Sequence, residues 1–208
     1  EKDGMGETII ITRSNKRATL FNTGIRNRIL YREEELVAGD RLLVAKNNYF
    51  WSEEYEEIDF IANGDVATVS RVKGTEKRYG FSFARVDLEF SERNVEMEAL
   101  IVLDALFSDS PALNREQQMS LFNQVMAELP GSQRERYKAL KKNPYFNALQ
   151  VKYAYAVTCH KAQGGQWKNV FIDMGYIPEE ALTTKDFYRW LYTAVTRGRE
   201  KVYVIGSF

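Results

Sequence analysis

The order of local patterns along the chain constrains its fold more than any single residue does. Near both ends, short apolar strands alternate with helices, whereas the central region carries several short strands separated by turn residues. Strands that alternate with helices are typical of a layered α/β domain, and repeated short strands favour a barrel. The sequence therefore predicts an α/β fold into which a small antiparallel β-barrel with helices is inserted.

The α/β part is predicted from both ends of the chain. Residues 7–12 form a short apolar run, and Ser14 or Asn15 then caps a helix that extends to about Tyr31. The second half adds strands at 151–157, 170–174 and 201–205, and a helix at 184–196. We therefore expect one discontinuous domain that comprises 1–38 and 149–208.

The inserted region, 39–148, is predicted from alternation and turn residues. Apolar and polar residues alternate over 65–72 and again over 79–90. Asn63-Gly64 predicts a tight hairpin, because both central positions of a type I′ turn need a positive φ. Further expected elements are a strand at 41–46, a strand at 95–103, and helices at 114–129 and 132–142, which Asn114 and Ser132 can cap.

Composition excludes several classes of site. Lysine plus arginine and aspartate plus glutamate each number 29, so a general basic coat for nucleic acid is absent and any such contact must be local. A single cysteine, Cys159, excludes an internal disulfide and fits a reducing compartment, and a single histidine makes a zinc site improbable. No apolar run approaches a membrane span, so we expect a cytoplasmic protein without a membrane partner. The chain begins at Glu1 without methionine, and we expect an excised fragment.

The segment from Thr158 to Gln166 carries the most concentrated polar chemistry. It follows an expected strand, and strand ends in open α/β sheets are where ligands bind. Its paired glycines, Gly164 and Gly165, allow close backbone approach, although a solvated loop with a glycine turn is the alternative. A thiol–imidazole pair at Cys159 and His160 is disfavoured, because neighbours on an extended strand point to opposite faces. His160 is instead expected to be a hydrogen-bonding contact residue.

Two arginines follow regular elements. Arg197 lies at the end of the helix expected over 184–196, where it either satisfies carbonyl groups at the negative end of the helix dipole or acts as an arginine finger on a phosphate. Arg13 lies where the first strand hands over to the first helix, a position that suits phosphate contact, although a surface arginine is the default.

The segment 46–51 mixes amides with aromatic residues, among them Asn48 and Tyr49. Such aromatic side chains either stack on nucleic-acid bases or fill the barrel. The helix expected over 132–142 is rich in lysine and arginine, which favours a solvated face and, as a minority interpretation, a surface that tracks phosphates.

Four segments together resemble the second motor domain of superfamily 1 helicases, especially the RecD-like branch that includes the exodeoxyribonuclease V alpha type. Residues 153–164, Y-A-Y-A-V-T-C-H-K-A-Q-G, resemble motif V of that family, and 191–197, L-Y-T-A-V-T-R, resemble motif VI. Residues 11–15 are similar to motif IV, and Asn48-Tyr49 with Asn63-Gly64-Asp65 is similar to a signature near the barrel insertion. The resemblance covers most of the chain and is weakest over 92–147.

The resemblance implies a RecA-like fold, of the class found in P-loop NTPases, and assigns roles to matching positions. Arg197 would be the arginine finger and Arg13 would assist it. Gln163 and Gly164 would line the nucleotide cleft, and Gln166 stands where many relatives have a glutamate that contacts the ribose. Single-stranded DNA would be contacted by Thr158, His160, Asn48 and Tyr49.

The resemblance also implies what must come from elsewhere. No G-x-x-x-x-G-K motif followed by serine or threonine occurs in the 208 residues. ATP and Mg²⁺ would therefore be held mainly by a first motor domain of the same protein, which would supply the phosphate loop, the Mg²⁺ ligands and the water-orienting acid. We expect this chain alone to be inactive, and expect other helicase–nuclease subunits of DNA repair and recombination as further partners.

Two rival functions remain open on the sequence. One is a helicase relative that has lost catalysis and serves as a scaffold or DNA-binding module, and the two arginines argue against it. The other is a nuclease, for which the sequence shows no clear cluster of acidic residues with a lysine in a metal-nuclease arrangement.

Overall fold

The computed structural model describes residues 4–206 and divides the chain into two compact units. One unit comprises Glu1–Glu33 and Ala154–Phe208, and the other comprises Glu34–Tyr153. Both boundaries differ from the predicted ones by a few residues, since 34–38 and 149–153 belong to the second unit. The difference at 149–153 arises because this strand pairs within the barrel.

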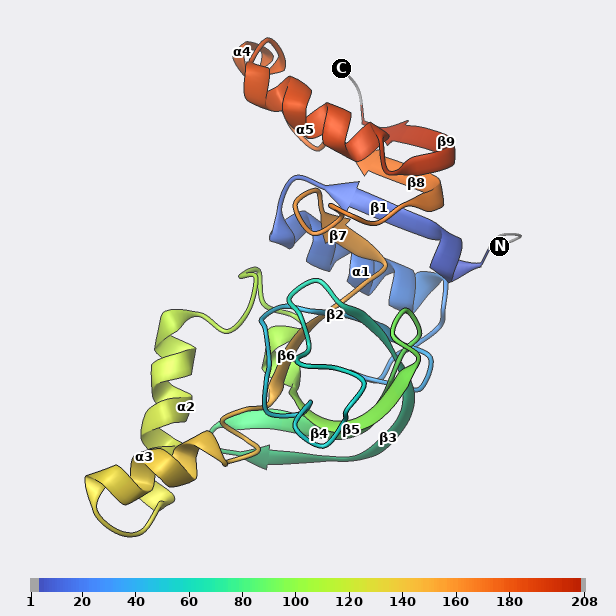
Figure 1. Cartoon of the computed structure of the whole chain (residues 1–208). Coiled ribbons are helices and arrows are strands. Elements are labelled where there is room, and N and C mark those ends of the chain that lie inside the picture. The colour runs from blue at the N-terminus through green and yellow to red at the C-terminus, as the bar shows by residue number, and fades with distance from the viewer. Residues whose placement is uncertain (1–3, 207–208) are drawn as a thin grey trace. The chain divides into compact units, whose positions relative to one another are not determined.

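The first unit is a parallel sheet with helical connections (Figure 1). Its strands lie in the order β7-β1-β8-β9, and each pair of neighbours is parallel. The α/β fold predicted for the two ends of the chain therefore holds for this unit. The strands are β1 (Thr8–Thr12), β7 (Ala156–Thr158), β8 (Trp167–Asp173) and β9 (Gly198–Ile205), and the helices are η1 (Met5–Glu7), α1 (Asn15–Arg28), α4 (Glu179–Leu182) and α5 (Lys185–Val195).

Helix α1 joins the two sequence halves of this unit. It begins at the predicted cap, because the Ser14 hydroxyl oxygen accepts a hydrogen bond from the Arg17 backbone at 3.2 Å. Buried Asn22 donates to the Ala156 carbonyl at 2.9 Å and accepts from the Ala156 backbone N–H at 2.8 Å. The helix stops at Arg28, three residues before the predicted Tyr31, whose φ of 52° lies outside the helical range.

The second unit is a closed five-strand barrel whose strands occur in the order β2-β3-β4-β5-β6. The predicted antiparallel pairing is wrong at one seam, because β5 and β6 are parallel, with Ile101 opposite Leu149. The helical segment between these strands carries the chain across the barrel and makes parallel entry feasible. The strands are β2 (Arg41–Val44), β3 (Val66–Arg78), β4 (Phe81–Phe90), β5 (Val95–Val102) and β6 (Leu149–Tyr153).

Two local predictions are corrected. The single strand predicted over 151–157 is two strands, β6 in the barrel and β7 in the sheet, so the chain leaves one unit for the other between them. The type I′ turn predicted at Asn63-Gly64 is also wrong, since only Gly64 has a positive φ. The hairpin with two positive φ values, 54° and 71°, lies at Tyr79-Gly80 between β3 and β4. There the Tyr79 hydroxyl donates to Glu128 at 2.8 Å, and this contact helps to hold an unfavourable backbone conformation.

The helical segment of the second unit contains η2 (Leu103–Ala105), α2 (Arg115–Glu128) and α3 (Gln133–Lys141). Both α-helices begin directly after the predicted caps: Asn114 and Gln117 form a reciprocal capping box, and Ser132 donates from its backbone N–H and its hydroxyl to the Glu135 carboxylate. These helices pack on the barrel through a shared apolar cluster that includes Phe83, Leu100, Leu121, Val125 and Leu140. Among residues 4–206, no helix has the length and apolar character needed to cross a membrane.

Candidate functional site

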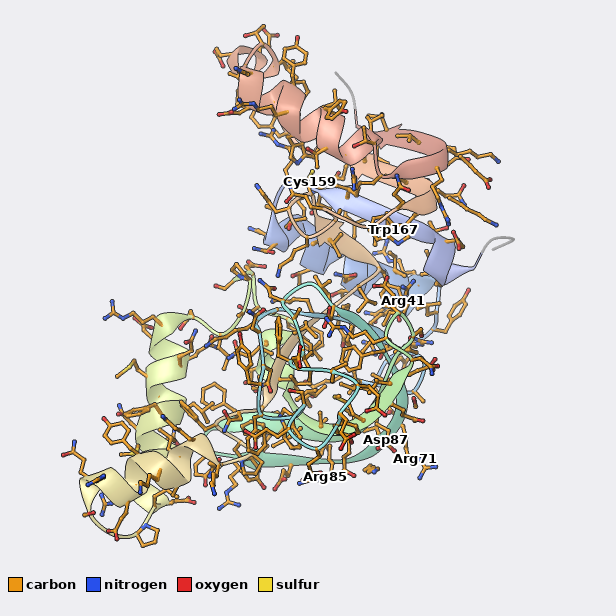
Figure 2. The ribbon with its side chains drawn as sticks, in the orientation of Figure 1. Arg41, Arg71, Arg85, Asp87, Cys159 and Trp167 are labelled. Atoms are coloured by element: carbon orange, nitrogen blue, oxygen red, sulfur yellow. The ribbon has the colours of Figure 1, made fainter. Side chains whose placement is uncertain are left out.

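The connection between β7 and β8 runs beside the second half of α5. Because these strands are parallel, residues 159–166 must cross from the carboxyl edge of the sheet to its amino edge. The Cys159 thiol donates to the Trp190 carbonyl at 3.5 Å, and near the other end Arg197 Nη1 donates to the Gly165 carbonyl at 3.2 Å. Cys159 and Trp167, labelled in Figure 2, mark the start of this connection and the strand that follows it. We call residues 159–166 the crossing segment.

Arg197 is anchored at the end of α5. Its Nε donates to the Thr193 carbonyl at 3.1 Å, and its Nη2 donates to the Thr196 hydroxyl at 3.1 Å. With the bond to Gly165, these contacts match the alternative in which the arginine satisfies carbonyls at a helix end. Nη1 and Nη2 each carry a second N–H, so the guanidinium is both fixed in orientation and able to donate further hydrogen bonds.

Arg13 is exposed and directly follows β1. Its guanidinium lies over the indole ring of Trp190, with Cζ 5.6 Å from the ring centroid. The indole in turn stacks on Phe187, with 6.3 Å between ring centroids and an interplanar angle of 23°. Trp190 belongs to a run of apolar residues in this helix that is typical of a core-facing stripe, whereas the half-buried indole serves as a platform for a cation. Phe187 and Trp190 are three positions apart on the helix, and this spacing is the same for a core stripe and for a cation platform. The sequence alone therefore could not distinguish the two.

The two arginines occupy opposite ends of the sheet. Arg13 follows the carboxyl end of β1, whereas Arg197 directly precedes β9 and its carbonyl accepts from the Trp167 backbone at the amino end of β8. Both nevertheless lie along α5, since Trp190 and Arg197 are seven positions apart (197 − 190), or about 10 Å at the rise of a helix. The cations therefore bracket the strip made by α5 and the crossing segment.

The residues predicted to line a nucleotide cleft all lie on the crossing segment. Gln163, Gly164 and Gln166 are exposed, and Gly164 has a φ of 87°, which favours glycine. At Gly165 a Cβ atom would lie 2.3 Å from Cη2 of Trp167, so the indole sets the path of the backbone there. The polar groups are thus accessible between the two arginines.

Thr158 and His160, predicted to contact DNA, lie at the start of the same strip. Thr158 is the half-buried last residue of β7, and its carbonyl accepts from the Lys161 backbone at 2.9 Å. His160 is exposed, whereas Cys159 is buried, so the neighbouring side chains lie in different environments. Burial raises the pKa of the Cys159 thiol, and the nearby charge of Arg197 opposes that shift only in part. The thiol is therefore protonated at neutral pH.

An ion pair that the sequence did not reveal supports the carboxyl edge of the sheet. Asp173, at the end of β8, is 1% exposed and accepts hydrogen bonds from Arg17 Nε at 2.8 Å and from Nη2 at 2.5 Å. The hydrogen bond to Asp173 raises the pKa of Arg17. This carboxylate is committed to α1, and residues 4–206 contain no group of three acidic, histidine or cysteine side chains that could hold a metal ion.

Asn48 and Tyr49 lie in the second unit and differ in their surroundings. Tyr49 is 61% exposed and stacks on Phe60 at 5.1 Å, so its ring does not fill the barrel. The Asn48 side chain donates to the Asn147 carbonyl at 2.8 Å and accepts from the backbone of Phe50 and Trp51, each at 3.1 Å. Asn48 therefore positions the loop that carries Tyr49.

Comparison with known proteins places part of the chain in a helicase context. Residues 153–205 match the family described as the UvrD-like helicase C-terminal domain. A 70-residue stretch is 34% identical to an uncharacterized protein, MJ1519, of Methanocaldococcus jannaschii, and covers 34% of this chain and 6% of that protein. The family match spans β7, the crossing segment, α5 and β9, and so includes Arg197.

Solved helicase structures share the fold of the chain. A Bacteroides Pif1 helicase in complex with ADP-AlF₃ and single-stranded DNA superposes with a TM-score of 0.52 at 13% identity, over 97% of this chain and 41% of that one. A structure of two coordinating Pif1 helicases at forked double-stranded DNA gives 0.51 at 11% identity, over 97% and 40%. The chain therefore has a mixed α/β fold like that of Pif1 helicases, and it spans less than half the length of these structures.

Proposed function

We propose that this chain is the C-terminal portion of an ATP-dependent DNA helicase, in which it supplies an arginine finger and part of the track for single-stranded DNA. The observation that carries the proposal is the placement of Arg197. Its guanidinium is fixed beside the crossing segment, within the region that matches a helicase C-terminal domain. A rigid cation with unused N–H groups suits recognition of a phosphate whose charge increases during transfer.

The geometry supports a division of roles along α5. Arg197 and Arg13 present positive charge at two points of the strip, and Gln163, Gly164 and Gln166 offer polar or backbone groups between them. ATP would lie between this surface and a first, RecA-like motor domain that holds most of the triphosphate and the Mg²⁺ ion. Attraction between the phosphates and both guanidinium groups would close the two motor domains, and hydrolysis would remove that attraction.

The crossing segment also supports coupling between DNA and nucleotide. Thr158 directly precedes it, His160 is its second residue, and Gln163 and Gly164 follow within the same short connection. A displacement of the segment by bound nucleotide would therefore move the groups proposed to contact DNA. The motif order further supports a RecD-like enzyme of the exodeoxyribonuclease V alpha type, acting in DNA repair or recombination in the cytoplasm, with helicase–nuclease subunits as partners.

The decisive test is Arg197→Ala in the full-length protein that contains this chain. Loss of an arginine finger lowers turnover by roughly 10³- to 10⁵-fold in enzymes that use one. We expect a loss of that order in DNA-stimulated ATP hydrolysis, with ATP binding largely retained. Arg199→Ala is the matched control, because Arg199 is exposed and pairs with Glu7 instead of the crossing segment. Unchanged turnover in Arg197→Ala would refute the assignment.

One observation favours a second candidate, a catalytically inactive scaffold or DNA-binding module. Arg197 donates to the carbonyls of Thr193 and Gly165 and to the Thr196 hydroxyl, which is the pattern expected of an arginine that completes a helix end. A scaffold would bind DNA without hydrolysing ATP in the full-length protein, whereas a motor would show DNA-stimulated hydrolysis. We expect the 208-residue chain by itself to show none, since it lacks a phosphate loop.

A further inference from the structure

A groove of about 290 Å³ lies in the second unit, between the loop that follows β2 and the pair of helices α2 and α3. One wall is formed by residues 46–50 and Glu53. The other includes Gln118 and Leu121 of α2 and Lys141, the last residue of α3. The helical wall belongs to the stretch that matches the helicase resemblance least, so that resemblance assigns it no role.

Asn147 holds the two walls together. Its backbone carbonyl accepts from Asn48 Nδ2 at 2.8 Å and from Trp51 Nε1 at 2.9 Å, which fixes the loop wall. Its side-chain amide donates to the carbonyls of Lys141 at 2.9 Å and Asn143 at 2.8 Å, which fixes the end of α3. These hydrogen bonds fix both walls, so a ligand need not order the groove.

The amide side chains of the groove already serve the protein. Besides Asn48 and Asn147, Gln118 donates to the Leu113 carbonyl at 2.6 Å, and Gln150 accepts from the Leu113 backbone at 3.0 Å. Paired readout of a base edge uses both the oxygen and the NH₂ group of one amide, and in each of these side chains at least one of the two is already engaged. The amides of this groove are therefore poorly suited to recognition of base identity.

Two ammonium groups and two aromatic rings remain available. Lys46 and Lys141 are exposed on opposite walls, and within the described residues 4–206 neither forms an ion pair. Tyr49 is exposed on the rim, where one face of its ring stacks on Phe60 and the other can receive a base, and the half-buried ring of Phe50 lines the same wall. Glu53 is the one carboxylate among the lining residues, and it opposes binding of an anion.

We propose that this groove binds single-stranded nucleic acid, with Lys46 and Lys141 on phosphates and Tyr49 stacked on a base, without selection of base sequence. Positive charge on both walls together with exposed rings is the combination that holds single strands. The basic face of α3 would continue the path beyond the groove through Arg134 and Lys138, which are exposed. The inference extends the proposed DNA track and to that extent rests on the proposed function, but it needs no ATP hydrolysis.

The test is equilibrium binding of fluorescent oligo(dT) to this chain at low salt without nucleotide, measured by anisotropy. Tyr49→Ala should weaken binding by roughly 5- to 150-fold, the range for loss of one stacked base. Lys141→Ala should weaken binding and lower the slope of log affinity against log salt by about 0.7, the value for one phosphate contact on a single strand. Glu53→Gln should tighten binding, because it removes a like charge.

Lys142→Ala is the matched control, because Lys142 is the exposed neighbour of Lys141 and does not line the groove. Equal effects of the two lysine variants would overturn the proposal in favour of diffuse attraction to α3. Absence of binding by the parent chain, or weaker binding by Glu53→Gln, would also overturn it. A strong preference for one base over the others would contradict the absence of sequence selection.

Photo-crosslinking of an oligonucleotide that contains 5-iodouracil gives a second measurement without mutation. Crosslinked peptides should map to residues 46–53, and absence of crosslinks there would contradict the groove assignment. The measurement involves no hydrolysis, so it is independent of the test of Arg197. Crosslinks at 46–53 together with unchanged turnover in Arg197→Ala would support nucleic-acid binding in the groove and refute the arginine-finger assignment. Absence of crosslinks at 46–53 together with lost turnover in Arg197→Ala would refute only the proposal for the groove.

Discussion

The guanidinium of Arg13 lies over the indole ring of Trp190, and this contact joins the end of β1 to the middle of α5. A cation above an aromatic face gains about 0.5–1 kcal/mol at an exposed site. Arg13 is otherwise a long exposed side chain with many rotamers, so the indole selects one direction for its charge. Helix α5 therefore helps to position both arginines that we propose to contact phosphate. It holds Arg13 through Trp190, and Arg197 lies at its carboxyl end.

Trp190→Leu in the full-length protein should weaken ATP affinity by about two- to five-fold, the amount expected from loss of the cation–aromatic contact. ADP affinity should change less, because Arg13 is proposed to assist Arg197, whose proposed contact is with the terminal phosphate. Trp190→Phe, which keeps a ring, should lose less than Trp190→Leu. Nucleotide titrations monitored by calorimetry measure all three.

A double-mutant cycle separates this positioning role from simple loss of packing. In an Arg13→Ala background, Trp190→Leu should have no further effect on the difference between ATP and ADP. If the two substitutions act additively on that difference, the indole does not work through Arg13.

The side chain of Asn22 links α1 to the start of β7 through buried hydrogen bonds to the carbonyl and to the backbone N–H of Ala156. Asn22→Leu should destabilise the chain by about 2–4 kcal/mol, because it leaves buried backbone groups of Ala156 without partners. Asn27→Ala on the same helix is the control, since Asn27 is exposed and alanine favours helices. Urea unfolding followed by circular dichroism should show a lower midpoint for Asn22→Leu only.

Two glycines should respond to alanine in opposite ways. Gly24 lies inside α1, and a Cβ atom there meets nothing within 4 Å, so Gly24→Ala should stabilise the chain by about 0.5–1 kcal/mol. Gly165→Ala would place a Cβ 2.3 Å from the Trp167 ring, and we expect a loss of about 1–3 kcal/mol from overpacking. Thermal unfolding of each variant measures whether its stability rises or falls. A stabilised Gly165→Ala would show that the indole moves freely.

Several elements could be predicted from the sequence because their causes are local. Ser14, Asn114 and Ser132 begin helices as expected, since each cap depends on residues within one turn. The apolar run at 7–12 gives β1 almost residue for residue.

Other features depend on partners far away in the sequence. Nothing local distinguishes 149–153, which pairs with the barrel, from 156–158, which pairs with β1. The turn at Tyr79-Gly80 takes its conformation with help from Glu128, about fifty positions away. At Asn63-Gly64 the dipeptide signal was misleading, and there the Asn63 backbone N–H donates to the Asn47 side chain, sixteen positions earlier. Within the candidate site, the crossing segment and Arg197 could be identified by motif, whereas the Trp190 platform, the Arg17–Asp173 pair and the helical wall of the groove required the folded chain.

Lys152 should make stability depend on pH in the alkaline range. It lies on β6, where its ammonium donates to the Ser108 carbonyl at 2.5 Å, and burial lowers its pKa from 10.5 to about 8, although Asp109 opposes the shift. Between pH 8 and 10.5 the unfolded chain therefore holds a proton that the folded chain has lost. The free energy of unfolding rises with pH wherever the unfolded state binds more protons, so this residue should add stability over that window.

Lys152→Met cannot titrate and should lack that rise. We expect the parent chain to gain about 1–2 kcal/mol relative to Lys152→Met between pH 7 and pH 10, after allowance for solvent screening of a half-buried group. Lys77→Met is the control, because Lys77 is exposed on β3 and should leave the pH profile of the parent unchanged. Urea unfolding at pH 7, 8.5 and 10 measures all three chains, and parallel profiles for parent and Lys152→Met would show that Lys152 keeps an ordinary pKa in the folded chain.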